Sequence, residues 1–216
     1  MMKIGFIGGG NMAQAIVSSL LTREMEPSQL FVTDPNNACQ KYFAELSIQT
    51  SASVEPLMQN ADILVMAVKP QILPSVLESM VEYLKSTHVI VSIAAGITIG
   101  QLRKYLKNAT NPIIRVMPNT PALVGLGMSA LVSDIELDAS TKVAVTAIFE
   151  ACGKALWVTS EEDIDTVTAV SGSGPAYFFL LIESLVNTGK RLGLSDEACR
   201  VMVTQTALGA AQMVET

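Results

Sequence analysis

Apolar and polar residues follow two distinct patterns along the first 160 residues of the chain. Short runs such as 63–68 and 88–93 are almost wholly apolar, which is typical of strands covered on both faces of a parallel sheet. The segments between such runs repeat apolar residues at helical spacing, as Met12, Ile16 and Leu20 do. This alternation predicts an α/β fold with a doubly wound, mostly parallel sheet. The predicted strands are 3–8, 30–34, 63–68, 88–93, 113–117, 128–133 and 155–158, and the predicted helices are 11–23, 36–46, 72–85, 98–107 and 139–151.

The strand pattern ends near residue 160, and only helical patterns follow. Helices are predicted over 161–169, over about 175–191 and from Ser195 to the last residue, with the segment 171–175 breaking the first from the second. Apolar residues lie on all sides of these helices, so the helices need a partner surface. We therefore expect two domains, 1–160 and 161–216, a homo-oligomer formed through the second, and a chain cut inside a helical domain at Thr216.

Composition and charge limit the classes of partner. Half of the residues are hydrophobic, 16% are charged, and the net charge is −6 with no basic run, so neither nucleic acid nor an anionic membrane is an expected partner. The uncharged runs 116–133 and 166–182 contain glycine and proline, so no membrane span is expected. Met1 leads directly into a strand, which predicts no signal peptide.

Cysteine and histidine are too sparse for a metal centre. Cys39, Cys152 and Cys199 are far apart in the chain, and we expect reduced, mostly buried thiols in a cytoplasmic protein. His88 is the single histidine and opens an apolar strand, where a surface or sheet-edge position is expected. No metal site is predicted.

The first predicted strand runs into a glycine-rich turn. Gly8, Gly10 and Ala13 match the dinucleotide fingerprint, in which glycines permit a tight turn and a close pyrophosphate, and a small residue brings helix and strand together. The helix start supplies unpaired N–H groups and the positive end of a dipole. A glycine turn in an unrelated α/β protein is the alternative. The residues predicted to bind the diphosphate are Gly8, Gly9, Gly10, Asn11 and Met12.

Asp34 ends the second predicted strand. A carboxylate at this place in a dinucleotide-binding unit accepts hydrogen bonds from the adenosine ribose, which favours NADH. No arginine lies within 33–38 to bind a 2′-phosphate. The alternative is that Asp34, with Pro35 and Asn36, only caps the following helix.

Small residues and prolines follow three further strands, in segments 67–70, 94–96 and 117–121. Ligands of doubly wound sheets bind beyond the carboxyl ends of the strands, so these segments together would form a rigid wall for a nicotinamide ring. Taken singly, segment 67–70 could carry a solvated lysine, segment 94–96 could be a close-packing site, and segment 117–121 could be a rigid turn.

At the start of the long apolar helix, a nest of hydroxyl and N–H groups could bind a carboxylate, or a glycine-rich hinge could join the domains. That segment is Ser171, Gly172, Ser173 and Gly174.

Five segments, 7–12, 67–70, 92–98, 115–121 and 171–177, together resemble the pyrroline-5-carboxylate reductase family in order and spacing. The resemblance covers the whole chain. It implies a Rossmann-type domain followed by an all-helical domain that dimerises by interleaving helices, with dimers assembling into a ring. It also implies reduction of the cyclic imine 1-pyrroline-5-carboxylate to L-proline with NADPH, the usual cofactor of the family, whereas Asp34 leaves NADH possible.

The resemblance also implies positions in the site. The family usually carries a Ser-Pro-Gly-Gly-Thr-Thr-like segment that binds the substrate carboxylate and places a threonine hydroxyl near the imine nitrogen. No such segment occurs in this chain, so the chain is incomplete or lacks part of the site, and no catalytic residue is assigned. The residues implied to border the nicotinamide and its ribose are Ala67, Val68, Lys69 and Pro70, with Ala95, Gly96 and Asn119 nearby.

Two other functions remain open. A β-hydroxyacid dehydrogenase-like enzyme would share the two-domain organisation but depends on a catalytic lysine in the helical domain. Lys190 is the only lysine there, and no partner motif accompanies it. A dinucleotide-binding protein without turnover is the second alternative.

Overall fold

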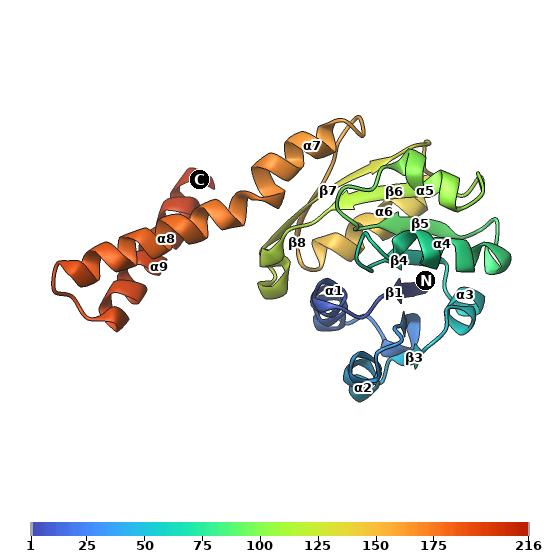
Figure 1. The fold of residues 1–216 in the computed structure, drawn as a ribbon, viewed down its shortest axis with the longest axis horizontal. Helices are drawn as coiled ribbons and strands as arrows, with labels where there is room; N and C mark the ends of the chain where they lie inside the picture. Colours follow the sequence, from blue (N-terminus) through green and yellow to red (C-terminus); the bar gives the residue numbers. More distant parts are fainter. Residues whose placement is uncertain (1, 216) are drawn as a thin grey trace. The chain divides into compact units, whose positions relative to one another are not determined.

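The computed structural model describes residues 2–215, which form two compact units, one ending at Gly172 and one beginning at Ser173. Figure 1 labels the helices and strands along the chain. Helix α7 (Asp163–Val167) belongs to the first unit, because its Ile164 is fully buried in one of that unit's cores. The expected division into domains 1–160 and 161–216 stays a prediction.

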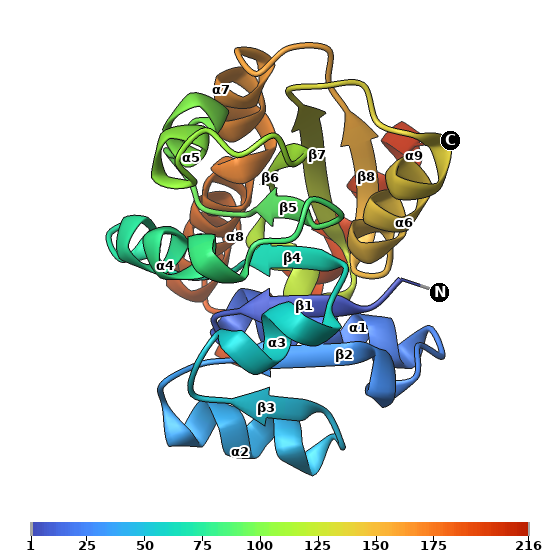
Figure 2. The same cartoon turned by 90° about the vertical axis from the view of Figure 1, so that its right-hand side faces the viewer.

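The first unit is built on one eight-stranded sheet with the order β3-β2-β1-β4-β5-β6-β7-β8 (Figure 2). Neighbouring strands are parallel except β6 and β7, which are antiparallel. The order of the first six strands is that of the Rossmann fold, so the predicted doubly wound, mostly parallel sheet is confirmed. The strands are β1 (Ile4–Ile7), β2 (Leu30–Thr33), β3 (Gln49–Ser51), β4 (Ile63–Met66), β5 (Val89–Ser92), β6 (Ile113–Met117), β7 (Gly127–Ser133) and β8 (Gly153–Trp157).

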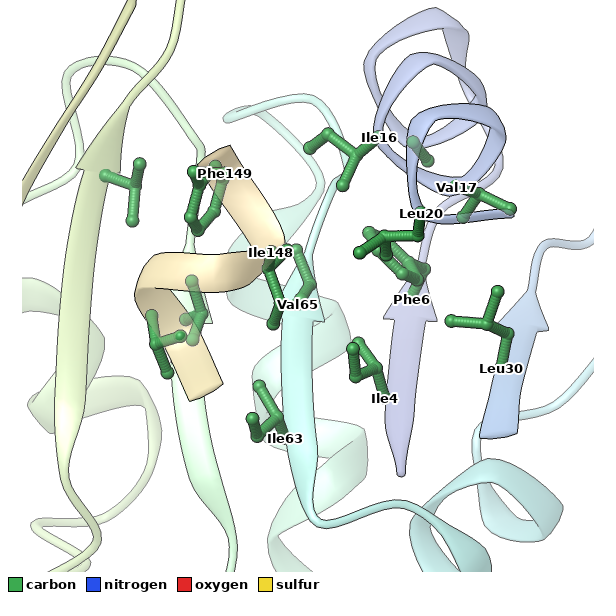
Figure 3. Close-up of a cluster of buried hydrophobic side chains, with 14 of the residues drawn as sticks. Ile4, Phe6, Ile16, Val17, Leu20, Leu30, Ile63, Val65, Ile148 and Phe149 are labelled. Atoms are coloured by element: carbon green, nitrogen blue, oxygen red, sulfur yellow. The ribbon is translucent and has the colours of Figure 1, made fainter. Parts of the chain in front are cut away.

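Helices cover both faces of the sheet because alternate strand residues point to opposite sides. In β1, Ile4 and Phe6 face one core, which Figure 3 shows with Leu20 of α1 and Phe149 of α6, whereas Ile7 faces the other. The first face is covered by α1 (Asn11–Thr22), α2 (Asn37–Glu45) and α6 (Ala139–Glu150), and the second by α3 (Glu55–Asn60), α4 (Leu73–Met80), α5 (Ile99–Tyr105) and α7. Short 3₁₀ turns are η1 (Pro27–Gln29), η2 (Val81–Tyr83) and η3 (Thr120–Val124).

Two elements of the first unit were not predicted, β3 and α3. Strand β3 is three partly exposed polar residues at the edge of the sheet, so it has no apolar run to reveal it. Helix α3 has six residues, too few for a helical period to repeat. Both lie beside β2, and the loop between them, with Glu55 at the start of α3, forms part of the wall of a hollow described below.

His88 is buried, with 1% of its surface exposed, so the expectation of a surface or sheet-edge position is wrong. Its Nδ1 accepts a hydrogen bond from the N–H of Lys85, and its Nε2 lies 3.1 Å from the carbonyl oxygen of Met58, to which it donates in the neutral ring. Burial, and secondly the charge of Lys85, lowers the pKa of His88, which agrees with a neutral ring. Both ring nitrogens are thus satisfied in the interior. Cys152 and Cys199 are buried and Cys39 is partly buried, as predicted, and all three are free thiols.

A π-helical turn, η4 (Thr168–Gly172), continues α7, and Ser173 lies outside both this turn and α8 (Gly174–Arg191), so the break predicted at 171–175 is confined to this one residue. Pro175 lies in the first turn of α8, where its missing N–H group leaves no helical hydrogen bond unmade. By length and composition the helical segment Asp163–Arg191 could cross a membrane. This is weak evidence, because the core helices of soluble proteins pass the same test.

The second unit is a pair of helices, α8 and α9 (Asp196–Glu215). They approach closely at Gly189, where an added Cβ would lie 2.7 Å from the Sγ of Cys199. Only Gly174 and Val186 of α8 are buried in this unit. Large apolar side chains therefore remain exposed on both helices: Tyr177, Phe178, Phe179, Leu180, Leu181, Leu185, Val201, Met202, Leu208, Met213 and Val214.

Candidate functional site

The glycine turn brings the ends of three strands together. Gly8 has a φ of +102°, and a Cβ on it would lie 2.6 Å from the carbonyl oxygen of Ala67. Its N–H group donates to the carbonyl of Thr33 at 2.8 Å. Only glycine adopts this backbone conformation without strain at such close quarters. Gly8 is therefore the residue that lets the ends of β1, β2 and β4 meet.

Gly10 serves a different purpose, because no atom lies within 4 Å of the place where its Cβ would be. It is the N-cap of α1, where no side chain caps the helix and no acidic residue lies in the first turn. The first N–H groups of a helix have no partners within the helix and carry partial positive charge. Open space beside such a helix start fits the diphosphate of a dinucleotide.

Asp34 connects the end of β2 to the glycine turn. Its Oδ2 accepts a hydrogen bond of 2.7 Å from the N–H of Gly9, and its Oδ1 accepts one of 2.8 Å from the N–H of Asn36. The cap of α2 is Asn36, whose side chain accepts from the N–H of Ala38. The capping side chain is therefore that of Asn36, and Asp34 supports the cap through the backbone of Asn36. A carboxylate has about four acceptor positions, so Asp34 can still accept from a ribose hydroxyl.

A hollow of about 490 Å³ lies at the carboxyl ends of β1, β4, β5 and β6. Among the described residues that line it, Lys69 carries the only charge. Predicted residues brought together here are Gly10, Asn11, Met12, Ala67, Val68, Lys69, Pro70 and Ala95. Ile93, Ala94, Met117 and Pro118 complete the lining, whereas Gly96 and Asn119 do not belong to it.

A second hollow, of about 430 Å³, lies on the other side of Val68, which lines both. Gly8 and Thr33 border it, and two carboxylates, Glu55 and Glu82, lie on its wall. The hydrogen bond and charge of Glu82 raise the pKa of Tyr83, so this phenol stays protonated. Sequence reasoning missed the part of this wall formed by Ala52, Ser53, Val54 and Glu55, because the short elements β3 and α3 on either side of this loop carry no apolar pattern.

The predicted carboxylate-binding segment divides between the two compact units. Ser171 and Gly172 end the π turn η4, and the hydroxyl of Ser171 donates to the carbonyl of Val167 at 3.2 Å. Ser173 and Gly174 begin the second unit. The hydroxyl of Ser171 is thus used within the helix, and the substrate role of the segment stays a prediction.

Lys190, the lysine that a β-hydroxyacid dehydrogenase-like mechanism would require, forms an ion pair with Asp196 at 2.7 Å. The hydrogen bond from Lys190, followed by that from Arg200, lowers the pKa of Asp196 to about 2. Lys190 is therefore held by a carboxylate that remains ionised at neutral pH. Within residues 2–215, no three histidine, cysteine or acidic side chains are grouped as metal ligands.

Two protein families match this chain. The family described as "NADP oxidoreductase coenzyme F420-dependent" matches residues 3–96, and "Pyrroline-5-carboxylate reductase dimerisation" matches residues 161–216. Pyrroline-5-carboxylate reductase of Pasteurella multocida is 40% identical over 98% of this chain and 78% of its own length.

Solved structures give the same result. A pyrroline-5-carboxylate reductase from Coxiella burnetii superposes with a TM-score of 0.93 at 37% identity, covering 100% of this chain and 80% of its own. Plasmodium falciparum pyrroline carboxylate reductase, solved with NADP bound, has a TM-score of 0.88 at 37% identity, covering 100% and 79% of the two chains.

Proposed function

This chain belongs to the pyrroline-5-carboxylate reductase family, and we propose that it reduces 1-pyrroline-5-carboxylate to L-proline with a nicotinamide dinucleotide. One observation supports this reaction most strongly. Two hollows meet at Val68, on either side of the glycine turn, at the edge of the sheet where dinucleotides bind in this fold. An extended dinucleotide needs two such compartments, one for each base.

We propose that the glycine turn and the start of α1 hold the diphosphate, through Gly8, Gly9, Gly10, Asn11 and Met12. Their contribution is backbone N–H groups and space, as the open position beside Gly10 supports. We propose that the second hollow, beside Asp34, takes the adenosine end.

The first hollow would then receive the nicotinamide ring. Ala67, Val68, Lys69 and Pro70 would border it on one side, and Ala95 and the Met117–Pro118 corner on the other. The bound dinucleotide supplies the hydride. The chain itself orients the reactants and excludes water, which lowers the barrier. A protonated imine is already electrophilic. No strong general acid is needed for this chemistry.

The choice of dinucleotide follows from charge. Glu55 and Glu82 line the second hollow, Asp34 lies beside it, and none of the described residues that line it is a lysine or arginine. Three carboxylates disfavour an additional 2′-phosphate, although the Plasmodium falciparum relative was solved with NADP bound. We propose that both NADPH and NADH serve and that Asp34 favours NADH.

The dimerisation family that matches residues 161–216 supports assembly of this chain with copies of itself. We propose that the exposed apolar faces of α8 and α9 form that contact, as a dimer or as a ring of dimers. We also propose that Ser171 to Gly174 bind the substrate carboxylate.

The function is tested by following NADH and NADPH oxidation with 1-pyrroline-5-carboxylate and identifying proline as the product. A panel of hydroxyacids serves as the comparison, since their oxidation would favour the dehydrogenase alternative. Dinucleotide binding without imine reduction would favour a protein without turnover. For the choice of dinucleotide, Asp34→Asn removes the charge while keeping one acceptor oxygen, and it is expected to shift the NADPH-to-NADH affinity ratio about tenfold toward NADPH.

A further inference from the structure

Asn119 has both ends of its side-chain amide engaged within the protein. Its Nδ2 donates to the carbonyl of Ser171 at 2.9 Å, and its Oδ1 accepts from the N–H of Met128 at 2.8 Å. The residue is 9% exposed. It thus joins the corner after β6 and the start of β7 to the last turn of η4, which is 52 positions away in the chain.

The carbonyl of Ser171 needs such a donor for a chemical reason. In an α-helix it would accept from the N–H four residues later, but that residue is Pro175, which has no N–H group. The next N–H, of Ala176, donates to Ser173 instead. Asn119 therefore supplies the hydrogen bond that the proline cannot make.

The same turn lies tightly against the wall of the proposed nicotinamide hollow. A Cβ on Gly172 would lie 2.7 Å from the Cε of Met117, and Met117 lines that hollow. Two contacts thus set the position of η4 relative to the hollow, the hydrogen bond from Asn119 and the close approach at Gly172. Asn119 itself does not line the hollow, although its neighbours Met117 and Pro118 do.

We propose that Asn119 is a positioning residue for the substrate-binding segment and not a ligand of the dinucleotide. By holding the carbonyl of Ser171, it fixes the π turn at the edge of the hollow and so places the backbone of Ser171 and Gly172 to receive the substrate. This assignment rests on the proposed function. It predicts that loss of the Asn119 donor affects the substrate and spares the dinucleotide.

The test uses Asn119→Asp, which keeps an acceptor for Met128 but loses the donor to Ser171, and Asn119→Ala, which loses both. In each variant the KM for 1-pyrroline-5-carboxylate is expected to rise at least about tenfold, while the dinucleotide Kd, measured by fluorescence, stays within about twofold. Adding Pro175→Ala to Asn119→Ala restores an N–H at the required place. It should recover most of the lost KM, whereas Pro175→Ala alone stays within about twofold of the wild type.

Equal rises in KM and in dinucleotide Kd, an unchanged KM, or no recovery in the double variant would overturn the assignment. Wild-type protein that binds dinucleotide but does not reduce the imine would overturn the proposed function instead. In that case hydrogen exchange tests whether Asn119 positions the π turn. Amides of 168–176 should exchange faster in Asn119→Ala and slow again in the double variant, with 63–66 unchanged, and equal exchange in all forms would refute the positioning role.

Discussion

The two compact units of this chain differ in how far they bury their own apolar side chains. In the first unit, β4 reads Ile63, Leu64, Val65 and Met66, and all four side chains have no exposed surface, because helices cover both faces of the sheet. In the second unit, Phe178 of α8 is 66% exposed. Strand β4 and helix α8 are both strongly apolar in sequence, yet only β4 is buried by its own chain.

The difference shows that apolar sequence predicts burial without saying which chain provides it. The first unit folds around its own core. The second unit exposes large apolar side chains on both of its helices, as expected of a segment that matches a dimerisation family. Stability of the first unit should therefore be a property of one chain, and order in the second a property of the assembly.

The largest effect is expected from charges placed on the α8 surface. Phe178→Glu combined with Leu181→Glu puts two carboxylates into the proposed contact, where burying each costs several kcal/mol. The dissociation constant of the assembly should rise at least about 10⁴-fold, measured by sedimentation. Val143→Glu, at an equally exposed apolar position in α6 of the first unit, is the matched control and should leave assembly unchanged. Intact oligomers in the double variant would place the contact elsewhere.

Removing the same phenyl ring from each unit sharpens the comparison. Phe43→Ala empties a fully buried position and should lower the free energy of unfolding by about 3–5 kcal/mol, independently of protein concentration. Phe178→Ala should lower the midpoint of thermal unfolding only in proportion to its loss of assembly, so its effect should depend on concentration. Calorimetry over a concentration series measures both. A concentration-independent loss in Phe178→Ala would show that α8 is stabilised within one chain.

The two glycines of the turn separate fold from ligand binding inside the first unit. Gly10→Val points into open space and should leave the unfolding midpoint nearly unchanged while weakening dinucleotide binding about 100-fold, or about 2.7 kcal/mol. Gly8→Val collides with the backbone of Ala67 and should destabilise the fold itself. Titration with NADPH and NADH, beside thermal unfolding, tests the pair. Unchanged affinity in Gly10→Val would refute the diphosphate site.

The smallest effect on the free energy of unfolding is expected at His88, which tests whether the first unit by itself buries this side chain. Burial lowers the pKa of the folded His88, so below about pH 6.5 the unfolded chain binds a proton that the folded chain does not. Stability is thus full above that pH and falls as the pH drops. Between pH 7.5 and 5.5 the wild type should lose at most about 1.4 kcal/mol more than His88→Asn in denaturant unfolding. Equal losses would show that the histidine titrates alike in both states.

Much of the fold followed from local pattern. The apolar run of β4 and the helical spacing of Met12, Ile16 and Leu20 each predicted the right element, because period and burial are encoded in neighbouring residues. Strand β3 did not follow, since its three polar residues are extended only because β2 pairs with them. The break predicted at 171–175 is shorter than expected, because a π turn continues the helical path as far as Gly172 and only Ser173 interrupts it.

The sequence by itself determined the alternation of strands and helices, the glycine turn, and the apolar helices that need a partner. Tertiary structure alone decided that Asp34 holds Gly9, that Asn119 holds Ser171, and that His88 is buried between Lys85 and Met58. The physical reason is the sequence separation of the interacting groups. A period of two or 3.6 residues is written in adjacent positions, whereas a hydrogen bond between groups 25 or 52 residues apart exists only after the sheet has brought them together.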